Sequence, residues 1–278
     1  MTLPNVIIAG APKCGTSSLY FWLAAHPDAC ASKAKETFYF ADDVNRFNKG
    51  LNFIENGLDP YQKHFEHCKG SKVIFEATAP YIYHQNAIEQ IAGLESKPKV
   101  IFILREPSKR MMSQYLFERY RTGRKQMELD EYLKLPGLLQ HGEYSGYLKK
   151  WEEAIGRDRM LVYIFEEFMN DTVAGMKNIA VNLGINPDFY DSFDFTTRNE
   201  TLKMKSTALH RAGLKVQEYV PHWLQSIILP LYLKFNSSGK PQATDAEKQL
   251  LKDEIVPYYK AEKSRMEEFL GRPIEVWN

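Results

Sequence analysis

The chain has 278 residues, of which 44% are hydrophobic and 26% charged, and its net charge is +1 from 36 basic and 35 acidic side chains. This length is enough for a sizeable core in one large or two small domains. The balanced charge gives no general attraction to polyanions, so it does not favour a nucleic-acid-binding protein.

The first expected element is a buried strand that runs directly into a glycine-bounded loop. The run Val6-Ile7-Ile8-Ala9 contains no polar residue, which is typical of a parallel strand covered on both faces. Gly10 and Gly15 bound the loop that follows, and a helix is expected from Thr16 onward. Together, a strand, such a loop and a helix N-terminus direct several backbone N–H groups at one point. This geometry binds phosphate.

The position of a lysine distinguishes this loop from the triphosphate-binding loop. Both have the Gly-x4-Gly spacing, but the triphosphate loop continues with Lys-Ser/Thr after its second glycine. Here Thr16-Ser17 follows Gly15, and the lysine is Lys13, inside the loop. The glycine spacing alone is equally typical of an ordinary strand-to-helix turn with a solvated lysine. The complete run from Pro12 to Ser17 favours an anion site.

Expected strands and helices alternate along the rest of the chain, which predicts an α/β fold: a P-loop-like three-layer sandwich with a central parallel sheet. Apolar runs predict strands at 29–31, 73–76, 99–104 and 160–165, and periodic segments predict helices at 85–92, 107–120, 144–155 and 172–183. Residues 41–72 predict short helices and loops, and the C-terminal part is expected to be helical with a polar link at 236–243. The economical interpretation is one domain over residues 1–278.

A second anion-binding pattern follows the strand expected at 99–104. Arg105 comes directly after this strand, where ligands bind in open parallel sheets, and a guanidinium can hold an anion with two parallel hydrogen bonds. Ser113, in the next expected helix, can add a hydroxyl. Alone, Arg105 would be an ordinary strand-end arginine paired with a glutamate. Together with the Lys13 loop, it predicts a ligand with two separate phosphates.

Three cysteines, Cys14, Cys30 and Cys68, show no metal-binding or redox spacing, and their odd number fits reduced thiols in an intracellular protein. We interpret Cys14 as a small loop residue whose backbone, rather than its side chain, faces the anion. No secretory signal precedes the first strand, and the longest apolar run, 223–233, is too short to span a bilayer. We therefore expect a cytoplasmic protein without a membrane span.

Taken together, these motifs resemble those of sulfotransferases that use PAPS (3′-phosphoadenosine 5′-phosphosulfate), in their carbohydrate-modifying and bacterial branch. Pro12-Lys-x-Gly-Thr-Ser-Ser-Leu19 resembles the loop that binds the 5′-phosphosulfate, and Arg105 with Pro107, Arg110 and Ser113 resembles the 3′-phosphate motif. Supporting matches extend over nearly the whole chain and include Lys35-Glu36-x-x-Tyr39-Phe40, Glu76-Ala-Thr-Ala-Pro80, Gly142-x-Tyr144 and the ending from Leu270 to Trp277.

The resemblance implies roles for individual residues in binding PAPS and its product PAP. Lys13 would contact the oxygen that bridges phosphate and sulfate and neutralise the charge that builds up on the leaving group. The 5′-phosphate would be held by the loop and the helix start, comprising Pro12, Lys13, Cys14, Gly15, Thr16, Ser17 and Ser18. Arg105 and Ser113 would hold the 3′-phosphate. Lys205 is a further candidate there, although a solvated loop lysine explains it equally well.

The resemblance also implies a general base for the acceptor. In the carbohydrate branch this is the glutamate of the Lys-Glu-x-x-aromatic-Phe motif, here Glu36. The alternative for Glu36 is a surface Lys–Glu pair. His84 is a competing base, with a structural histidine as its alternative, and His26 is interpreted as part of a His-Pro turn. No metal is expected.

The implied acceptor is a hydroxyl or amine of a carbohydrate or other small metabolite. Ala77 stands where heparan-type enzymes commonly have a lysine, which favours a bacterial-type acceptor over a highly sulfated glycosaminoglycan. Two alternatives are a P-loop kinase that uses Mg-ATP, with Glu76 or Glu166 as metal partner, and a nucleotide-binding module without transfer. The missing lysine after Gly15 counts against the kinase, and Lys13 with Glu36 counts against the binding module.

Overall fold

The computed structural model describes residues 2–121, 127–195 and 241–277. By their contacts these residues group into two compact units. The first lies within Met1–Pro107, Glu143–Arg198 and Lys260–Asn278, and the second within Ser108–Gly142 and Asn199–Tyr259. The single domain over residues 1–278 stays a prediction.

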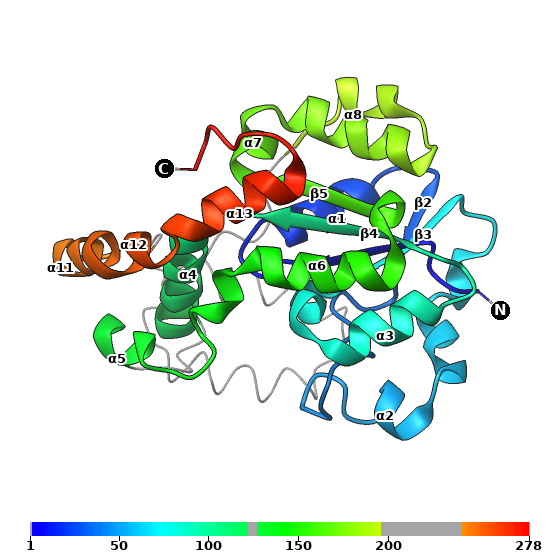
Figure 1. Ribbon diagram of the computed structural model, residues 1–278. Helices are drawn as coiled ribbons and strands as arrows, with labels where there is room; N and C mark the ends of the chain where they lie inside the picture. Colours follow the sequence, from blue (N-terminus) through cyan, green and yellow to red (C-terminus); the bar gives the residue numbers. More distant parts are fainter. Residues whose placement is uncertain (1, 122–126, 196–240, 278) are drawn as a thin grey trace, which may run out of the picture. The chain divides into compact units, whose positions relative to one another are not determined.

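The first unit is built on a five-stranded parallel sheet with the strand order β2-β3-β1-β4-β5 (Figure 1). The strands are β1 (Val6–Gly10), β2 (Ala29–Ala31), β3 (Val73–Ala77), β4 (Lys99–Leu104) and β5 (Met160–Ile164). All five residues of the central strand β1 are buried, as an uninterrupted apolar run predicts. The α/β fold with a central parallel sheet is thereby confirmed. Phe165, expected at the end of a strand, instead begins a helix.

Helices α1 (Thr16–Ala24), α3 (Gln85–Gly93), α6 (Tyr144–Ile155), α7 (Phe165–Asn170), α8 (Thr172–Leu183) and α13 (Lys260–Leu270) belong to the first unit. Helix α6 buries Tyr144, Leu148, Trp151 and Ile155 at helical spacing. It lies beside α3 in Figure 1, and α13 packs on it. The predicted helices at 144–155 and 172–183 have these bounds, and Gly184 ends α8 in the left-handed conformation.

The segment between β2 and β3 contains only short elements, as predicted. These are α2 (Phe53–Asn56) and 3-10 turns at Asp59–His64 and Glu66–Cys68. A further 3-10 turn, Ala79–Tyr83, connects β3 to α3.

The second unit contains α4 (Pro107–Leu116), a π-helical turn (Phe117–Arg121), α5 (Leu129–Leu133), α11 (Asp245–Leu250), a second π-helical turn (Leu251–Ile255) and α12 (Val256–Tyr258). It has a small core of its own that includes Met111, Tyr115, Tyr132 and Ile255. Most of the polar link predicted at 236–243 lies outside the described residues. Within the described part of the chain, no helix combines the length and apolarity needed to cross a membrane.

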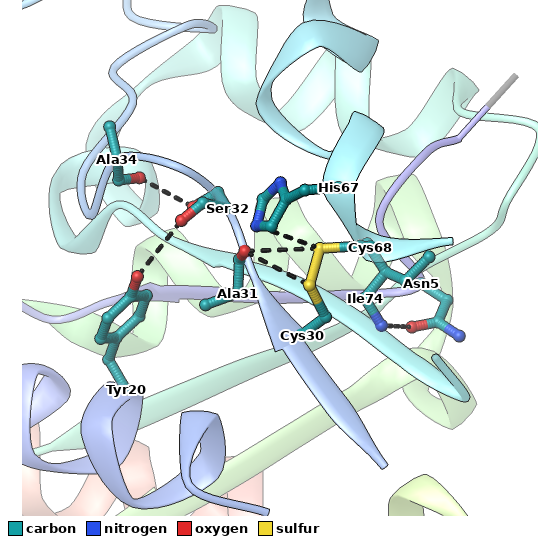
Figure 2. Close-up of a disulfide and its surroundings, with 9 residues drawn as sticks. All are labelled: Asn5, Tyr20, Cys30, Ala31, Ser32, Ala34, His67, Cys68 and Ile74. Atoms are coloured by element: carbon teal, nitrogen blue, oxygen red, sulfur yellow. Dashed lines mark hydrogen bonds between the residues drawn. A yellow bond between two sulfur atoms is a disulfide. The ribbon is translucent and has the colours of Figure 1, made fainter. Parts of the chain in front are cut away.

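Cys30 and Cys68 form a disulfide (Figure 2), so the expectation of reduced thiols is wrong for this pair. Backbone bonds bring the two cysteines together: Ser32 N donates to Phe75 O at 2.7 Å, and Lys33 N donates to His64 O at 2.9 Å. The cysteines are 38 residues apart, and such a spacing carries no local sequence signal. The cytoplasmic location stays a prediction.

Candidate functional site

The loop between β1 and α1 has the backbone geometry of an anion site. Lys13 and Gly15 both adopt left-handed conformations, with φ of 70° and 88°, and Gly15 is the N-cap of α1. Leu19 N donates to Gly15 O at 3.1 Å, so the N–H groups of residues 15–18 precede the first helical bond and are directed into the loop. Consecutive N–H groups at the positive end of a helix attract an anion.

The aromatic ring of Phe165 connects this loop to Arg105. A Cβ atom added to Gly15 would lie 2.8 Å from Cε2 of Phe165, so the glycine is required for this close packing as well as for its positive φ. The Arg105 guanidinium carbon lies 5.2 Å from the centroid of the same ring. Both Gly15 and Arg105 therefore contact one side chain at the junction of β5 and α7.

The sheet topology explains why these groups meet. Strands β1 and β4 are neighbours, and the chain leaves β1 toward β2 but leaves β4 toward β5. Ligands bind outside the carboxyl ends of parallel strands at such a switch point. The glycine loop follows β1 and Arg105 follows β4, so both lie at this position.

The environment of Arg105 fits an anionic ligand. Its backbone carbonyl accepts a hydrogen bond from Tyr144 Oη at 2.9 Å, which holds the residue in place. Its Nε is buried and has no hydrogen-bond partner among the described residues. A buried donor left unsatisfied costs about 1–3 kcal/mol. A phosphate oxygen at this nitrogen would remove the cost.

The remaining loop side chains differ in exposure. Cys14 is buried, with Sγ 3.6 Å from Pro12 O and 3.9 Å from Tyr144 Oη, so its side chain lies in the core. The hydroxyl residues Thr16 and Ser18 are also buried, whereas Ser17 is half-buried. Ser17 is therefore the most accessible hydroxyl at the start of α1.

The structure does not place the two other residues assigned to the 3′-phosphate beside Arg105. Ser113 lies on α4 in the second unit, where it is half-buried. Lys205 lies outside the described residues. Their assignments stay predictions.

Glu36 lies on the loop after β2, at the carboxyl end of the neighbouring strand β3. Its backbone N donates to Ala77 O at 2.9 Å, and its φ is 62°. Since Ala77 pairs with Ile8 of β1, this bond holds Glu36 at the sheet edge from which the glycine loop begins. The carboxylate is paired with Lys35 Nζ at 3.0 Å and its side chain is 37% exposed. A partly exposed carboxylate can accept a proton from a substrate.

Glu76, next to Ala77 on β3, fixes the residue that follows Glu36. Its carboxylate is fully buried and accepts hydrogen bonds from Thr37 Oγ1 at 2.6 Å, from Thr78 Oγ1 at 2.9 Å and from the Tyr61 hydroxyl. Burial raises the pKa of Glu76, and these hydrogen bonds oppose the shift. Sequence reasoning missed this role, because the signal is a set of hydroxyl residues spread over three segments.

The kinase alternative is not favoured, because both of its candidate metal carboxylates have structural partners. Glu166 accepts hydrogen bonds from Glu106 N at 3.1 Å through Oε1 and from Trp277 Nε1 at 3.0 Å through Oε2. Glu76 is enclosed by hydroxyl donors, as described above. Neither carboxylate is arranged to hold a nucleotide-bound metal.

The two histidines have structural contacts. His84 Nδ1 accepts from Asp42 N at 3.0 Å, and the Asp42 carboxylate caps α3 by accepting from Gln85 N at 3.1 Å. His26 is buried, and its Nδ1 accepts from Asp28 N at 3.1 Å, which confirms its place in the turn. Of the two candidate bases, Glu36 and His84, Glu36 is therefore favoured, because the His84 ring already has a structural role.

Comparisons with known proteins agree with this geometry. The family model described as "Sulfotransferase domain" matches residues 3–216. The membrane-associated sulfotransferase kil1 of Dictyostelium discoideum is 34% identical over 120 residues, which are 42% of this chain and 23% of that protein. Mouse bifunctional heparan sulfate N-deacetylase/N-sulfotransferase 4 is 26% identical over 204 residues, which are 67% of this chain and 23% of that protein. The chain thus spans less than a quarter of the length of either relative.

Among solved structures, a sulfotransferase from Alicyclobacillus acidocaldarius superposes with a TM-score of 0.70 at 20% identity. The match covers 100% of this chain and 99% of that one. At this identity the likeness concerns the fold.

Proposed function

Because the chain belongs to the sulfotransferase domain family, we propose that it transfers the sulfuryl group of PAPS to a hydroxyl or amine of an acceptor. One observation carries the proposal: the Phe165 ring contacts both Gly15 and Arg105, so a nest of N–H groups and a guanidinium share one site. Two anion-binding groups at one switch point suit a ligand with a 5′-phosphosulfate and a 3′-phosphate.

The residues of the glycine loop serve the 5′ side of this ligand. The N–H groups of residues 15–18, together with the Ser17 hydroxyl, hold the 5′-phosphate. When bound, PAPS supplies an activated sulfuryl group. Lys13 neutralises the negative charge that develops on the bridging oxygen as that group departs, which is the role of preorganised electrostatic stabilisation.

Arg105 serves the 3′ side. Its planar guanidinium can bind two phosphate oxygens at once, and its buried Nε adds a donor that water does not reach. A nucleotide without a 3′-phosphate would leave this donor unsatisfied. The site therefore discriminates PAPS from ATP.

Glu36 removes the proton from the acceptor. The Glu76 network holds Thr37, so the backbone beside Glu36 is fixed while its carboxylate stays partly exposed. A carbohydrate acceptor is supported by the heparan sulfate N-sulfotransferase named among the relatives. Ala77 offers this acceptor no positive charge, which favours a less highly charged carbohydrate or a small metabolite.

Isothermal titration tests the nucleotide site. Wild type should bind PAP more tightly than Mg-ATP. Arg105→Ala should weaken PAP binding about 10- to 100-fold, because one charge-assisted contact is lost. The variant should barely change the affinity for adenosine 5′-phosphosulfate, which lacks the 3′-phosphate. Tight binding of Mg-ATP together with indifference to PAP would overturn the proposed cofactor.

Transfer is tested with PAPS and a panel of carbohydrate and small-molecule acceptors, followed by mass spectrometry for sulfate gain. Lys13→Ala and Glu36→Gln should each lower kcat by about 10²- to 10⁴-fold. Lys63→Ala and Glu95→Gln, at exposed positions, are the matched controls. Unchanged turnover in Lys13→Ala and Glu36→Gln would refute the assigned roles.

A further inference from the structure

The disulfide lies beside a histidine, and this grouping is independent of the nucleotide site. Cys30 is on the edge strand β2, and Cys68 ends the 3-10 turn Glu66–Cys68. Figure 2 shows the His67 ring directed at the Cys68 sulfur, with Nε2 3.5 Å from Sγ. Cys68 is buried, Cys30 half-buried and His67 exposed.

The three side chains form a set of zinc ligands. Their ligand atoms all lie within 4.8 Å of one another, and no other such group of three or more occurs among the described residues. Cysteine thiolates and neutral imidazole are the ligands that zinc prefers. Bonds of about 2.3 Å to sulfur and 2.0 Å to nitrogen in a tetrahedron place these two atoms about 3.5 Å apart. The His67–Cys68 pair already has this separation.

The two sulfurs need only a small rearrangement to become ligands. A tetrahedral zinc ion holds two thiolate sulfurs about 3.8 Å apart, and this is also the spacing of non-bonded atoms in contact. The Cα atoms of Cys30 and Cys68 are 5.5 Å apart, so rotation of the two side chains can bring the released sulfurs to this spacing. The exposed His67 leaves the fourth position of the tetrahedron to water.

We propose that Cys30, His67 and Cys68 in their reduced form bind a divalent cation of the zinc class, as an alternative to the disulfide. A dithiol reductant breaks the sulfur–sulfur bond by exchange, giving two protein thiols and the oxidised dithiol. The cation then binds two thiolates and a neutral imidazole, and two protons are released. Either state joins β2 to the turn that precedes β3.

The position of this cross-link in the chain matters for the segment that carries the predicted base Glu36. Cys30 and Cys68 are 38 residues apart, and the segment between them contains Lys35 and Glu36. Under reducing conditions, in which the disulfide is lost, the bound metal therefore keeps the two ends of this segment joined. The proposal does not depend on the identity of the nucleotide or of the acceptor.

Cobalt titration tests the site, since tetrahedral cobalt–thiolate coordination gives intense near-ultraviolet charge-transfer bands. The full chain is reduced with a phosphine, which leaves no competing thiol, and desalted without oxygen. Reduced wild type should bind one Co²⁺ per chain with these bands, and Zn²⁺ should displace it. Cys30→Ser and Cys68→Ser should abolish the bands, and His67→Ala should weaken binding at least tenfold. Oxidised wild type should bind none, and Cys14→Ser should bind like wild type.

Reduced wild type without thiolate–cobalt bands would overturn the proposal, as would a loss of binding in Cys14→Ser. If the reduced chain unfolds in the absence of metal, circular dichroism replaces the absorption readout. In that case Zn²⁺ should restore the native spectrum of wild type but not of Cys68→Ser. A reduced wild-type chain that Zn²⁺ does not refold would refute the site equally.

Discussion

Removing the Cys30–Cys68 disulfide should lower the free energy of unfolding by about 4 kcal/mol. The cross-link joins residues 38 positions apart, and the chain-entropy relation for a loop of that length gives about 4 kcal/mol at 25 °C. The stabilisation arises mainly in the unfolded chain, which the cross-link deprives of conformations. The native contacts of β2 are expected to remain.

The double variant Cys30→Ser/Cys68→Ser tests this value without leaving an unpaired thiol at the joint. In a chain of this size, 1 kcal/mol corresponds to roughly 2–4 °C in Tm, so the variant should unfold on the order of 10 °C below wild type. Circular dichroism melts in the presence of a chelator exclude rescue by metal. A reductant should lower the Tm of wild type to that of the variant and leave the variant unchanged.

Two results would refute this reasoning. One is a variant that melts within about 2 °C of oxidised wild type, because the cross-link would then contribute far less than loop closure requires. The other is a reductant that lowers the Tm of wild type and variant equally. That result would show that the reductant acts on the protein at a place other than the Cys30–Cys68 disulfide.

Two further predictions concern the site. Gly15→Ala should weaken PAP binding at least tenfold in calorimetry, since alanine at a φ of 88° costs about 1–2 kcal/mol and its Cβ would lie 2.8 Å from a ring carbon. The control Gly184→Ala, at a φ of 70° with open space around it, should lose stability but keep its PAP affinity. Equal losses of PAP affinity in the two variants would contradict the packing argument. Glu76→Gln should remove the part of the pH dependence of stability that comes from Glu76. Burial raises the pKa of Glu76 above its ordinary value of 4.5. Its contribution to the free energy of unfolding is therefore full below pH 4.5 and is lost as the pH rises through the raised pKa. The difference in unfolding free energy between wild type and Glu76→Gln, from urea titrations, should therefore decrease from pH 4.5 upward, and a constant difference would contradict this sign.

The buried strands could be predicted from the sequence because their signal is local. A central parallel strand is covered on both faces and therefore appears as an uninterrupted apolar run, and β4 (Lys99–Leu104) has the bounds that this run predicts. The bounds of α6 and α8 follow from helical periodicity and from Gly184. The apolar run predicts that Phe165 ends a strand. Phe165 begins α7 instead, and its ring packs on Gly15 and Arg105.

The anion site could be predicted in part. The glycine loop with Lys13 and the strand-end position of Arg105 were predictable, because each lies within a short segment of regular pattern. The glycine loop and Arg105 lie at one switch point because the strand order is β2-β3-β1-β4-β5. The strand order can be read only from the three-dimensional structure. The roles of Lys13 and Glu36 stay predictions.

Contacts between distant segments were decided by the tertiary structure alone. The Cys30–Cys68 disulfide and the hydroxyl donors around Glu76 join residues far apart in the chain. Such contacts leave no period or spacing in the sequence, because they depend on where the sheet and its connecting turns bring the backbone. The sequence thus determined the local elements and the chemistry that each carries. The packing of the sheet and its turns decided which of these groups meet.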